Sequence, residues 1–216
     1  MNRSWRLIDS GFQTAAYNMS FDGRLFEEAL SAGDFSPALR IYGFRHPAVT
    51  CGYSQKDLAQ KIKTGIESAF RMTGGGLVFH GTDFTYAVIA SRMHHPGFAS
   101  IETSYRIFHE IIREAFAKGG IETELFKGGG RRAPGGFCFT NPVRNDVMFK
   151  AEKVAGAAEK RSKGIFLHQG TVELAPFLKE GAGYLSFYEK FKQWFLEAFR
   201  AYFGTEFVIE SGPVEL

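Results

Sequence analysis

Three consecutive glycines at residues 74–76 constrain the fold of this chain more than any other stretch. They lie between Arg71 and an apolar segment, and residues 85–90 further along are patterned as a buried strand. Glycine has no Cβ, so it lets the backbone approach a ligand closely and adopt a positive φ. The run matches neither the GxxxxGKS/T phosphate loop nor the GxGxxG dinucleotide motif. It therefore predicts either a tight turn between strands or a ligand site built from backbone.

The order of the patterned segments indicates a mixed α and β protein. The strand-like segments are residues 4–9, 39–42, 48–53, 85–90, 146–149, 152–157, 164–167 and 170–174. The helix-like segments are residues 21–30, 56–63, 102–118 and 184–203. Gly11 is expected to end the first strand, and residues 67–71 lead into the glycines. Several strands follow one another too closely for an all-parallel sheet, so we expect an α+β fold.

Composition limits the class of protein. The chain has 216 residues, which is typical of one domain, and 44% of them are hydrophobic, which is enough for a sizeable core. Its net charge of +3 is too small to indicate a nucleic-acid partner. No apolar run reaches the roughly 18 residues of a membrane helix, and no signal core follows Met1, so we expect a soluble cytoplasmic protein without a membrane partner. Cys51 and Cys138 lack the spacing of a metal site, so no metal is predicted.

Cys138 and Lys153 are the residues whose chemistry stands out. Cys138 lies between a glycine-rich basic segment, residues 127–136, that we interpret as a mobile loop, and the turn at Asn141-Pro142. Lys153 follows across a predicted hairpin, and a nearby cation lowers the pKa of a thiol and makes it a nucleophile. The alternative for Cys138 is an inert core residue among phenylalanines, which is also our interpretation of Cys51.

Five segments, in order, resemble motifs of the lipoate–protein ligase and octanoyltransferase family, which is related to biotin–protein ligases. Residues 71–80 resemble its RRxTGG-x-V-x-H signature. Residues 5–19 are similar to its opening strand and the NMA-x-D helix start. Residues 39–55 are similar to RxYxWxxPxxSxGxxQ, residues 153–158 to KxxGSA, and residues 168–171 to QHGS or HHGT. The resemblance therefore covers most of the chain.

The resemblance implies a central mixed, largely antiparallel sheet flanked by helices, with an acyl chain in a tunnel beneath the glycine loop. Lys153 would contact the carbonyl or acyl-phosphate oxygens of the substrate, where an ammonium stabilises developing negative charge. His80 would order the loop, and a hydrogen-bonded structural role is at least as good an interpretation as a role in proton transfer. The substrate-binding residues implied are Arg71, Thr73, Gly74, Gly75, Gly76, His80, Tyr86, Gly156 and Ala157.

One transferase branch of the family uses a cysteine as an acyl-thioester relay, in a pattern C-F-x-x-P, then E or D, then K-V-A-G-S-A. Residues 138–142, Asp146 and residues 153–158 match it without a gap, and residues 85–88 resemble the branch's LTYSV. The match implies that Cys138 and Lys153 are catalytic. Octanoyl or lipoyl would pass from acyl carrier protein, through Cys138, to a lysine of a lipoyl domain or of the glycine-cleavage H protein, without any cofactor.

Other residues resemble the ATP-dependent ligases of the family. Residues 144–146 resemble their GRND run, and Gly76 stands where cysteine-type transferases have arginine. Gly81 follows His80 at a position where the family frequently has an acid, and Ala157 replaces the serine of the GSA motif. The alternative is therefore a lipoate–protein ligase that uses lipoate, ATP and Mg²⁺ to form lipoyl-AMP.

Length bears on this choice, because residues 1–216 leave room for a single catalytic domain and none for the C-terminal accessory domain typical of one-chain ligases. We therefore favour transfer, although a separate accessory subunit would restore the ligase interpretation. A non-catalytic acyl- or carrier-binding module is a further alternative. Biotin ligation is disfavoured because the GRGRxGR-type loop is absent.

Overall fold

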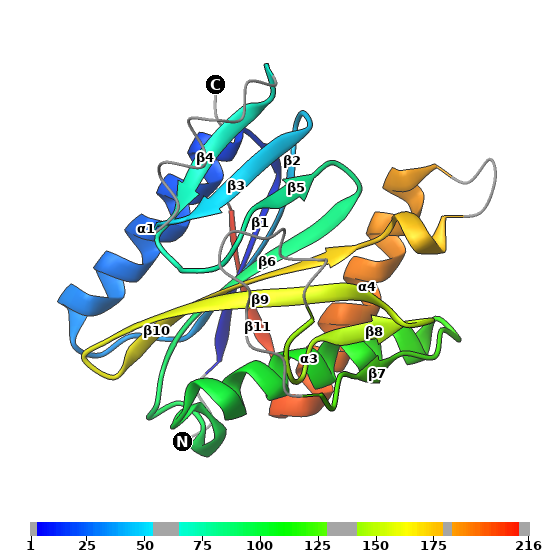
Figure 1. Cartoon of the computed structure of the whole chain (residues 1–216). Helices are drawn as coiled ribbons and strands as arrows, with labels where there is room; N and C mark the ends of the chain where they lie inside the picture. Colours follow the sequence, from blue (N-terminus) through cyan, green and yellow to red (C-terminus); the bar gives the residue numbers. More distant parts are fainter. Residues whose placement is uncertain (1–3, 54–64, 129–141, 179–182, 212–216) are drawn as a thin grey trace.

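The computed structural model describes residues 4–53, 65–128, 142–178 and 183–211. Within these ranges, the main sheet has eight strands in the order β11-β1-β2-β6-β10-β9-β8-β7 (Figure 1). Their bounds are β1 Trp5–Gln13, β2 Ala38–Phe44, β6 Asp83–Ser91, β7 Glu124–Leu125, β8 Val147–Phe149, β9 Glu152–Ser162, β10 Ile165–Glu173 and β11 Phe207–Ser211. β1 runs parallel to β11 and β2, whereas every other neighbouring pair is antiparallel. The prediction of a mixed, largely antiparallel sheet is confirmed.

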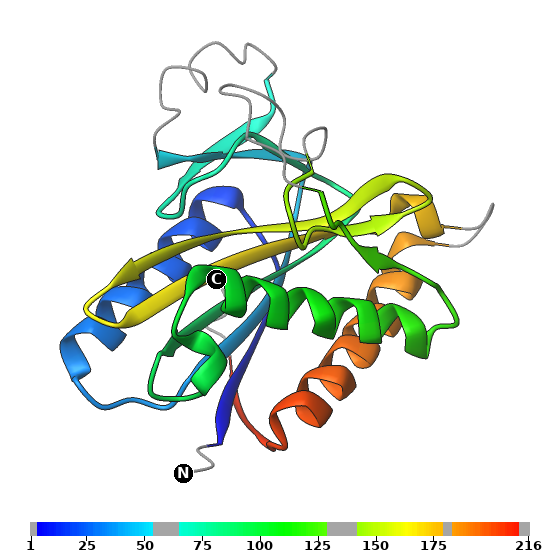
Figure 2. The same cartoon turned by 60° about the horizontal axis from the view of Figure 1, so that its bottom comes forward.

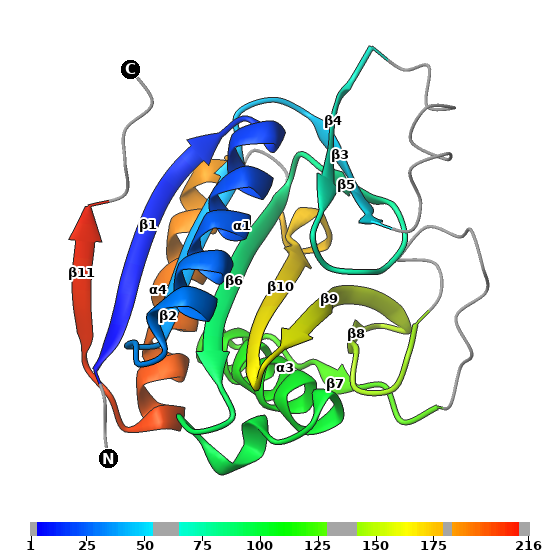
Figure 3. The same ribbon diagram turned by 90° about the vertical axis from the view of Figure 1, so that its left-hand side faces the viewer.

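Helices cover both faces of this sheet. Helix α1, Ala15–Ala32, lies on one face, and α3, Ile101–Lys118, and α4, Tyr184–Phe203, lie on the other (Figures 2 and 3). Two short 3-10 helices, η2 at Pro96–Phe98 and η4 at Ala175–Phe177, complete the described helical segments. None of the helices in the described ranges has the length and apolar composition needed to cross a membrane.

A second, smaller sheet lies on the α1 side of the main sheet, at one end (Figure 2). It has the order β4-β3-β5, with β4 Glu67–Arg71, β3 Ala48–Gly52 and β5 Val78–His80. β3 is parallel to β4 and antiparallel to β5. The glycines at 74–76 lie in the connection from β4 to β5, the two outer strands, and this connection passes the end of β3 at Gly52.

Side chains alternate between the two faces of the main sheet, as the pleat of a strand requires. On β6, Phe84, Tyr86 and Val88 join a large aromatic core with α3 and α4. Ala87 and Ile89 join a second core with α1. The aromatic core is the larger of the two, so the α3–α4 face holds most of the buried phenylalanines.

The two long helices agree with the sequence prediction. Helix α3 begins after Ser100, whose side chain accepts a hydrogen bond from Thr103 N, and ends at Gly119. Helix α4 occupies the predicted residues 184–203. Each has an apolar stripe that packs on the sheet, which is why periodicity identified them.

Other boundaries differ from the prediction for local reasons. Helix α1 begins six residues earlier than residue 21, at Ala15, because the side chain of Thr14 accepts from Tyr17 N. β1 continues past Gly11, whose φ of 58° accompanies a register shift in the pairing with β2. Residues 164–167 and 170–174 belong to one strand, β10. The predicted helix at 56–63, and residues 129–136 of the predicted loop, lie outside the described residues.

Candidate functional site

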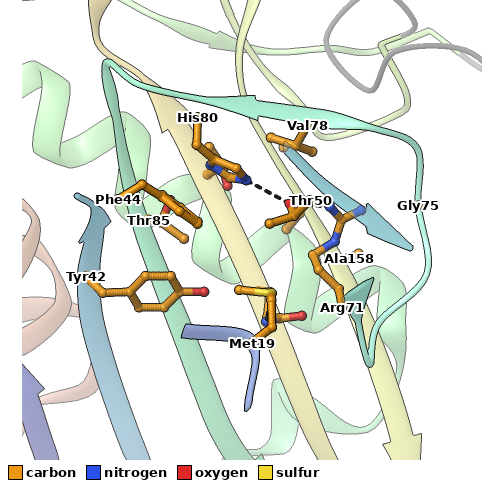
Figure 4. Close-up of a pocket in the computed structure, with 14 residues that line it drawn as sticks. Met19, Tyr42, Phe44, Thr50, Arg71, Gly75, Val78, His80, Thr85 and Ala158 are labelled. Carbon is orange, nitrogen blue, oxygen red and sulfur yellow. Dashed lines mark hydrogen bonds between the residues drawn. The ribbon is translucent and has the colours of Figure 1, made fainter. Parts of the chain in front are cut away.

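A narrow pocket lies between the small sheet and the β6, β9 and β10 strands of the main sheet (Figure 4). Its cavity volume is about 30 Å³. The residues that line it are Met19, Tyr42, Phe44, Thr50, Arg71, Gly75, Val78, His80, Thr85, Gly156, Ala157, Ala158, Gln169 and Thr171. Five of the predicted substrate-binding positions are therefore brought together from two sheets: Arg71, Gly75, His80, Gly156 and Ala157.

Arg71 organises the glycine loop from the end of β4. Its Nη1 donates to Thr50 Oγ1 at 2.6 Å, and its Nη2 donates to the carbonyl oxygens of Gly74 at 3.2 Å and Gly76 at 2.7 Å. The guanidinium carries a fixed fork of donors, so it can hold several acceptors in one geometry. Arg71 therefore fixes two carbonyls of the glycine run while it lines the pocket itself.

Two glycines in this region are required by geometry. Gly75 has φ of 101°, a conformation that residues with a side chain rarely adopt. A Cβ on Gly52, at the end of β3, would lie 2.4 Å from the Gly75 carbonyl oxygen. Gly52 thus allows the loop to pack against β3. A Cβ on Gly74, by contrast, would have no atom within 4 Å.

His80 and Asp83 continue the contacts of Arg71 into the main sheet. His80 Nε2 lies 2.7 Å from Thr50 Oγ1, which Figure 4 marks, and His80 Nδ1 lies 2.8 Å from Asp83 Oδ2. Because the carboxylate accepts, Nδ1 donates; in the neutral ring Nε2 then accepts from the Thr50 hydroxyl, whose oxygen accepts from Arg71. The result is a buried chain Asp83–His80–Thr50–Arg71 that supports the glycine loop and favours the structural interpretation of His80.

The carboxylate of Asp83 accepts several hydrogen bonds in this position. Its carboxylate also accepts from Gly81 N at 2.8 Å and Thr85 Oγ1 at 2.7 Å. Burial acts to raise the pKa of Asp83, but the charge and hydrogen bond of His80, with the bonds from Thr85 and Gly81, outweigh it and leave this pKa below its ordinary value. The carboxyl is therefore ionised at neutral pH.

Thr73 ties the loop to a buried ion pair beneath the pocket. Its Oγ1 donates to Gln169 Oε1 at 2.7 Å, and Gln169 Nε2 donates to Asp22 Oδ2 at 2.7 Å. Asp22 Oδ1 pairs with Arg40 Nη1 at 2.7 Å, and both side chains are fully buried. Thr73 thus acts through Gln169 rather than on the pocket surface. Sequence reasoning assigned no role to Gln169, Asp22 or Arg40, although Gln169 and Arg40 lie within segments that resemble family motifs.

Lys153, near the start of β9, forms a buried ion pair at the other side of the pocket. Its Nζ lies 2.8 Å from Asp146 Oδ2, and the two side chains are 1% and 0% exposed. The same carboxylate oxygen accepts from Val143 N at 2.7 Å. A Cβ on Gly156 would lie 2.5 Å from Lys153 Cε and 2.6 Å from Nζ, so a glycine at 156 makes room for the lysine.

This pair gives the site its main chemical capacity. An ammonium held by a carboxylate in a water-excluded position is already oriented, so it can stabilise an oxyanion without reorganisation. Gly156 lies between Lys153 and the pocket, because it lines the pocket and also contacts the lysine side chain. Lys153 itself is not among the residues that line the pocket, and it reaches the pocket region through its contact with Gly156.

Tyr86 requires a correction, because it does not line the pocket. It lies on the α3–α4 face of β6, within the aromatic core, and its hydroxyl is 3.1 Å from His168 Nε2. A Cβ on Gly170, on the next strand, would lie 2.3 Å from the Tyr86 ring. The alternation of β6 turns Thr85, rather than Tyr86, towards the pocket.

The remaining predicted residues occupy other positions. Gly74 lines two larger clefts, each of about 600 Å³, and Gly76 contributes the carbonyl that Arg71 holds. One cleft is bordered by residues 143–145 and 157–159, the other by Tyr53, Phe70, Met72 and residues 159–161. Cys138 lies outside the described residues. Within the described ranges, no cluster of three or more His, Cys, Asp or Glu side chains is arranged to hold a metal.

Solved structures with the same fold come from lipoate-metabolising proteins. A Thermoplasma acidophilum protein solved with bound lipoic acid superposes with a TM-score of 0.70 at 21% identity, covering 98% of this chain and 90% of its own. A lipoate-protein ligase A bound with ATP superposes with a TM-score of 0.67 at 20% identity, covering 98% and 89%. At these identities the likeness establishes the fold.

Sequence relatives are closer. Octanoyltransferase LipM of Anoxybacillus flavithermus is 34% identical over 182 residues, which is 79% of this chain and 65% of that relative. Octanoyltransferase LipM of Bacillus subtilis is 31% identical over 184 residues, which is 79% of this chain and 66% of that relative. The chain thus spans somewhat less than two thirds of the length of these relatives.

The family model described as the lipoyl protein ligase A/B catalytic domain matches residues 14–201. This range contains both walls of the pocket, from Met19 to Thr171, and the Lys153–Asp146 pair. The chain therefore belongs to the lipoyl protein ligase A/B catalytic-domain family.

Proposed function

We propose that this chain transfers an octanoyl group from a carrier-protein thioester to a lysine of a lipoyl domain or of the glycine-cleavage H protein. The observation that carries the proposal is the buried Lys153–Asp146 pair beside a pocket roofed by the glycine loop. The similarity to proteins named Octanoyltransferase LipM supports the same reaction. A reduced thiol is needed for it, which fits a cytoplasmic setting.

Two acyl-exchange steps account for the transfer. The Cys138 thiolate attacks the thioester carbonyl, Lys153 stabilises the oxyanion, and the C–S bond to the carrier breaks, so the carrier sulfur leaves as a thiolate and the acyl-enzyme thioester forms. The neutral amine of the acceptor lysine then attacks that thioester, the Cys138 sulfur leaves as a thiolate, and the amine loses a proton to solvent as the amide forms. A thioester is already activated, so neither step requires ATP or a metal.

The lining of the pocket suits an apolar chain that ends in a polar group. Met19, Tyr42, Phe44 and Val78 supply apolar surface, whereas Thr50 and Arg71 are polar. Met19 is the most adaptable of these residues, because its side chain has three rotatable bonds and no branch.

A second candidate is ATP-dependent lipoate ligation. Residues 143–145, which include part of the GRND-like run, line a cleft of about 600 Å³ next to Gly74. This cleft is large enough for more of a substrate than the pocket itself holds. A lipoate–protein ligase would place lipoate in the pocket and use the cleft for ATP with Mg²⁺.

Intact-mass analysis separates these functions. With octanoyl acyl carrier protein and no ATP, the chain is expected to gain one octanoyl group that neutral hydroxylamine removes. Cys138→Ser is expected to lose this adduct; a hydroxylamine-labile adduct retained by Cys138→Ser would refute Cys138 as the nucleophile. Release of pyrophosphate with lipoate, ATP and Mg²⁺ that survives Cys138→Ser would identify a ligase. Octanoate binding with neither product would identify a non-catalytic binding module.

A further inference from the structure

We propose that Tyr105 of α3 is a positioning residue that sets the place of the Lys153 ammonium. The inference rests on the role proposed above for Lys153. The Tyr105 hydroxyl donates to Asp146 Oδ1 at 2.5 Å and accepts from Ala157 N at 3.1 Å. A backbone N–H can only donate and a carboxylate can only accept, so both directions are fixed. Tyr105 therefore links Asp146 to the pocket strand β9.

Asp146 passes this constraint on to Lys153. Its Oδ1 accepts a hydrogen bond from the Tyr105 hydroxyl. Its Oδ2 accepts from Lys153 Nζ at 2.8 Å and from Val143 N at 2.7 Å. Three donors on two oxygens fix the plane of the carboxylate. All three side chains are buried, where hydrogen bonds are stronger than in water. If the Tyr105 hydroxyl is removed, Oδ1 loses this donor and only Oδ2 keeps the donors named here, so we expect the carboxylate to tilt about Oδ2 and the ammonium to shift with it.

His109 gives independent support, because it holds the same turn from the same helix. It lies four residues after Tyr105, one turn along α3, and its Nδ1 donates to the Asn145 carbonyl oxygen at 2.6 Å. Asn145 has φ of 71°, an uncommon conformation for a residue other than glycine, and its N donates to Phe126 O at 2.9 Å. The turn 143–146 is therefore held by two side chains of α3, not by Tyr105 alone.

Tyr188 of α4 provides a matched control. It is also a buried tyrosine on a helix that packs against the sheet, but its hydroxyl has no hydrogen-bond partner among the described residues. Tyr→Phe at this position removes the same atom from a similar core without touching the Lys153–Asp146 pair. A difference between Tyr105→Phe and Tyr188→Phe therefore reports the bonds of the Tyr105 hydroxyl.

The first test is steady-state octanoyl transfer from octanoyl acyl carrier protein to a lipoyl domain. We expect Tyr105→Phe to lower kcat about 10-fold or more, with KM for the carrier changed by less than about 2-fold. The reason is that the loss of a hydrogen bond to the Asp146 carboxylate displaces the Lys153 ammonium. Tyr188→Phe is expected to leave both constants unchanged. If the wild type transfers octanoyl, equal kcat values for the two variants would overturn the proposal.

A double-mutant comparison tests the route through Asp146. If Tyr105 acts through that carboxylate, Tyr105→Phe combined with Asp146→Asn is expected to be as slow as Asp146→Asn alone. Effects that multiply independently would contradict the proposed route.

Amine labelling separates this proposal from the proposed function. We expect an amine-reactive acylating reagent to label Lys153 faster in Tyr105→Phe than in Tyr188→Phe or the wild type, as followed by peptide mass spectrometry. If the wild type transfers no octanoyl but this difference is found, the proposed function fails and the positioning role stands. If labelling and kcat are both unchanged in Tyr105→Phe, the positioning role fails.

Discussion

The two walls of the pocket are held in place by different forces. The wall formed by residues 156–158 of β9, which we call the strand wall, lies in the eight-stranded sheet in front of the large aromatic core with α3 and α4. The wall formed by the small sheet and its glycine loop, which we call the glycine wall, has a separate apolar cluster of three described residues, Val49, Cys51 and Leu77, and adds only Ala48, with Ala69 and Met72 beside it, to the core under α1. It is supported instead by the hydrogen-bonded chain from Asp83 to Arg71.

An acyl pocket needs a fixed place for its charged group and a wall that can adjust to the acyl chain, and the two walls differ in this way. The strand wall lies on a large buried apolar area, which has no directional requirement, and Lys153 beside it is placed by its ion pair with Asp146. The glycine wall is fixed by directional hydrogen bonds over little core, so small changes in those bonds displace it. We therefore expect the glycine wall to adjust when an acyl chain enters, and the strand wall to stay.

Removal of a core ring behind the strand wall has the largest expected effect. Phe108 on α3 is fully buried, with its ring centroid 5.7 Å from that of Phe98 and 4.6 Å from that of His168. Phe108→Ala is expected to lower the free energy of unfolding by about 3–5 kcal/mol, measured by urea denaturation. Phe79→Ala, at a ring 48% exposed on the glycine wall, is the control and is expected to change it by less than about 0.5 kcal/mol. Similar losses in both variants would refute the contrast.

Gly156→Ala tests the contact between the strand wall and Lys153. The new Cβ would displace the lysine side chain, so we expect kcat for octanoyl transfer to fall on the order of 100-fold. Gly183→Ala is the control, because a Cβ at this helix N-cap has no atom within 4 Å. Wild-type kcat in Gly156→Ala would show that the position of Lys153 is unimportant for the reaction.

Acid is expected to lower the stability of the folded chain, because His109 is buried on α3 behind the strand wall. Burial is the main cause that lowers the pKa of His109 to about 4, whereas in the unfolded chain it lies near the ordinary value of about 6.5. As the pH falls between these values the unfolded state binds the proton first, so stability decreases, by about 2 kcal/mol from about pH 7 to about pH 4.5. His109→Gln is expected to lose less stability over that range in urea denaturation; an equal loss would assign the acid sensitivity to other groups.

Asp83→Asn is expected to have a smaller effect that is confined to the glycine wall. It weakens the bond to His80, at a cost of about 1–2 kcal/mol. Hydrogen exchange should become faster at residues 78–80 and remain unchanged at residues 156–158. Because the folded pKa of Asp83 is depressed, its stabilisation is complete above its unfolded pKa of about 4 and is lost as the pH falls through the lower folded value. Faster exchange in both walls would show that the walls are not independent.

The sequence predicted those parts of the fold that depend on local signals. Helices α3 and α4 show regular apolar stripes, and α3 also has a capping serine and terminal glycines. β3 was predicted as a strand at residues 48–53, but its place in a separate small sheet was not, and neither were β4, β5 and β11. These strands are short, and β11 pairs with distant residues, as Phe207 does with Trp5. Pairing over such separations leaves no periodic pattern in either segment.

The sequence motifs identified several of the residues that meet at the pocket. Arg71, His80 and Lys153 lie in segments that resemble family motifs, and the structure brings them to one pocket region. Tyr105 and Asp83 were missed because their roles arise from contacts across the fold. Tyr86 was misplaced because motif matching does not distinguish the two faces of a strand. The alternation of Phe84, Tyr86 and Val88 with Thr85 and Ala87 carried that information.

The most direct test of the account is ATP-free acylation of an acceptor lipoyl domain by octanoyl acyl carrier protein, followed by intact mass. The wild type is expected to add one octanoyl group to the acceptor. Lys153→Met is expected to slow this addition at least about 100-fold, because the charge that stabilises the oxyanion is gone. Transfer by Lys153→Met at the wild-type rate, or no transfer by the wild type unless ATP is present, would contradict the account.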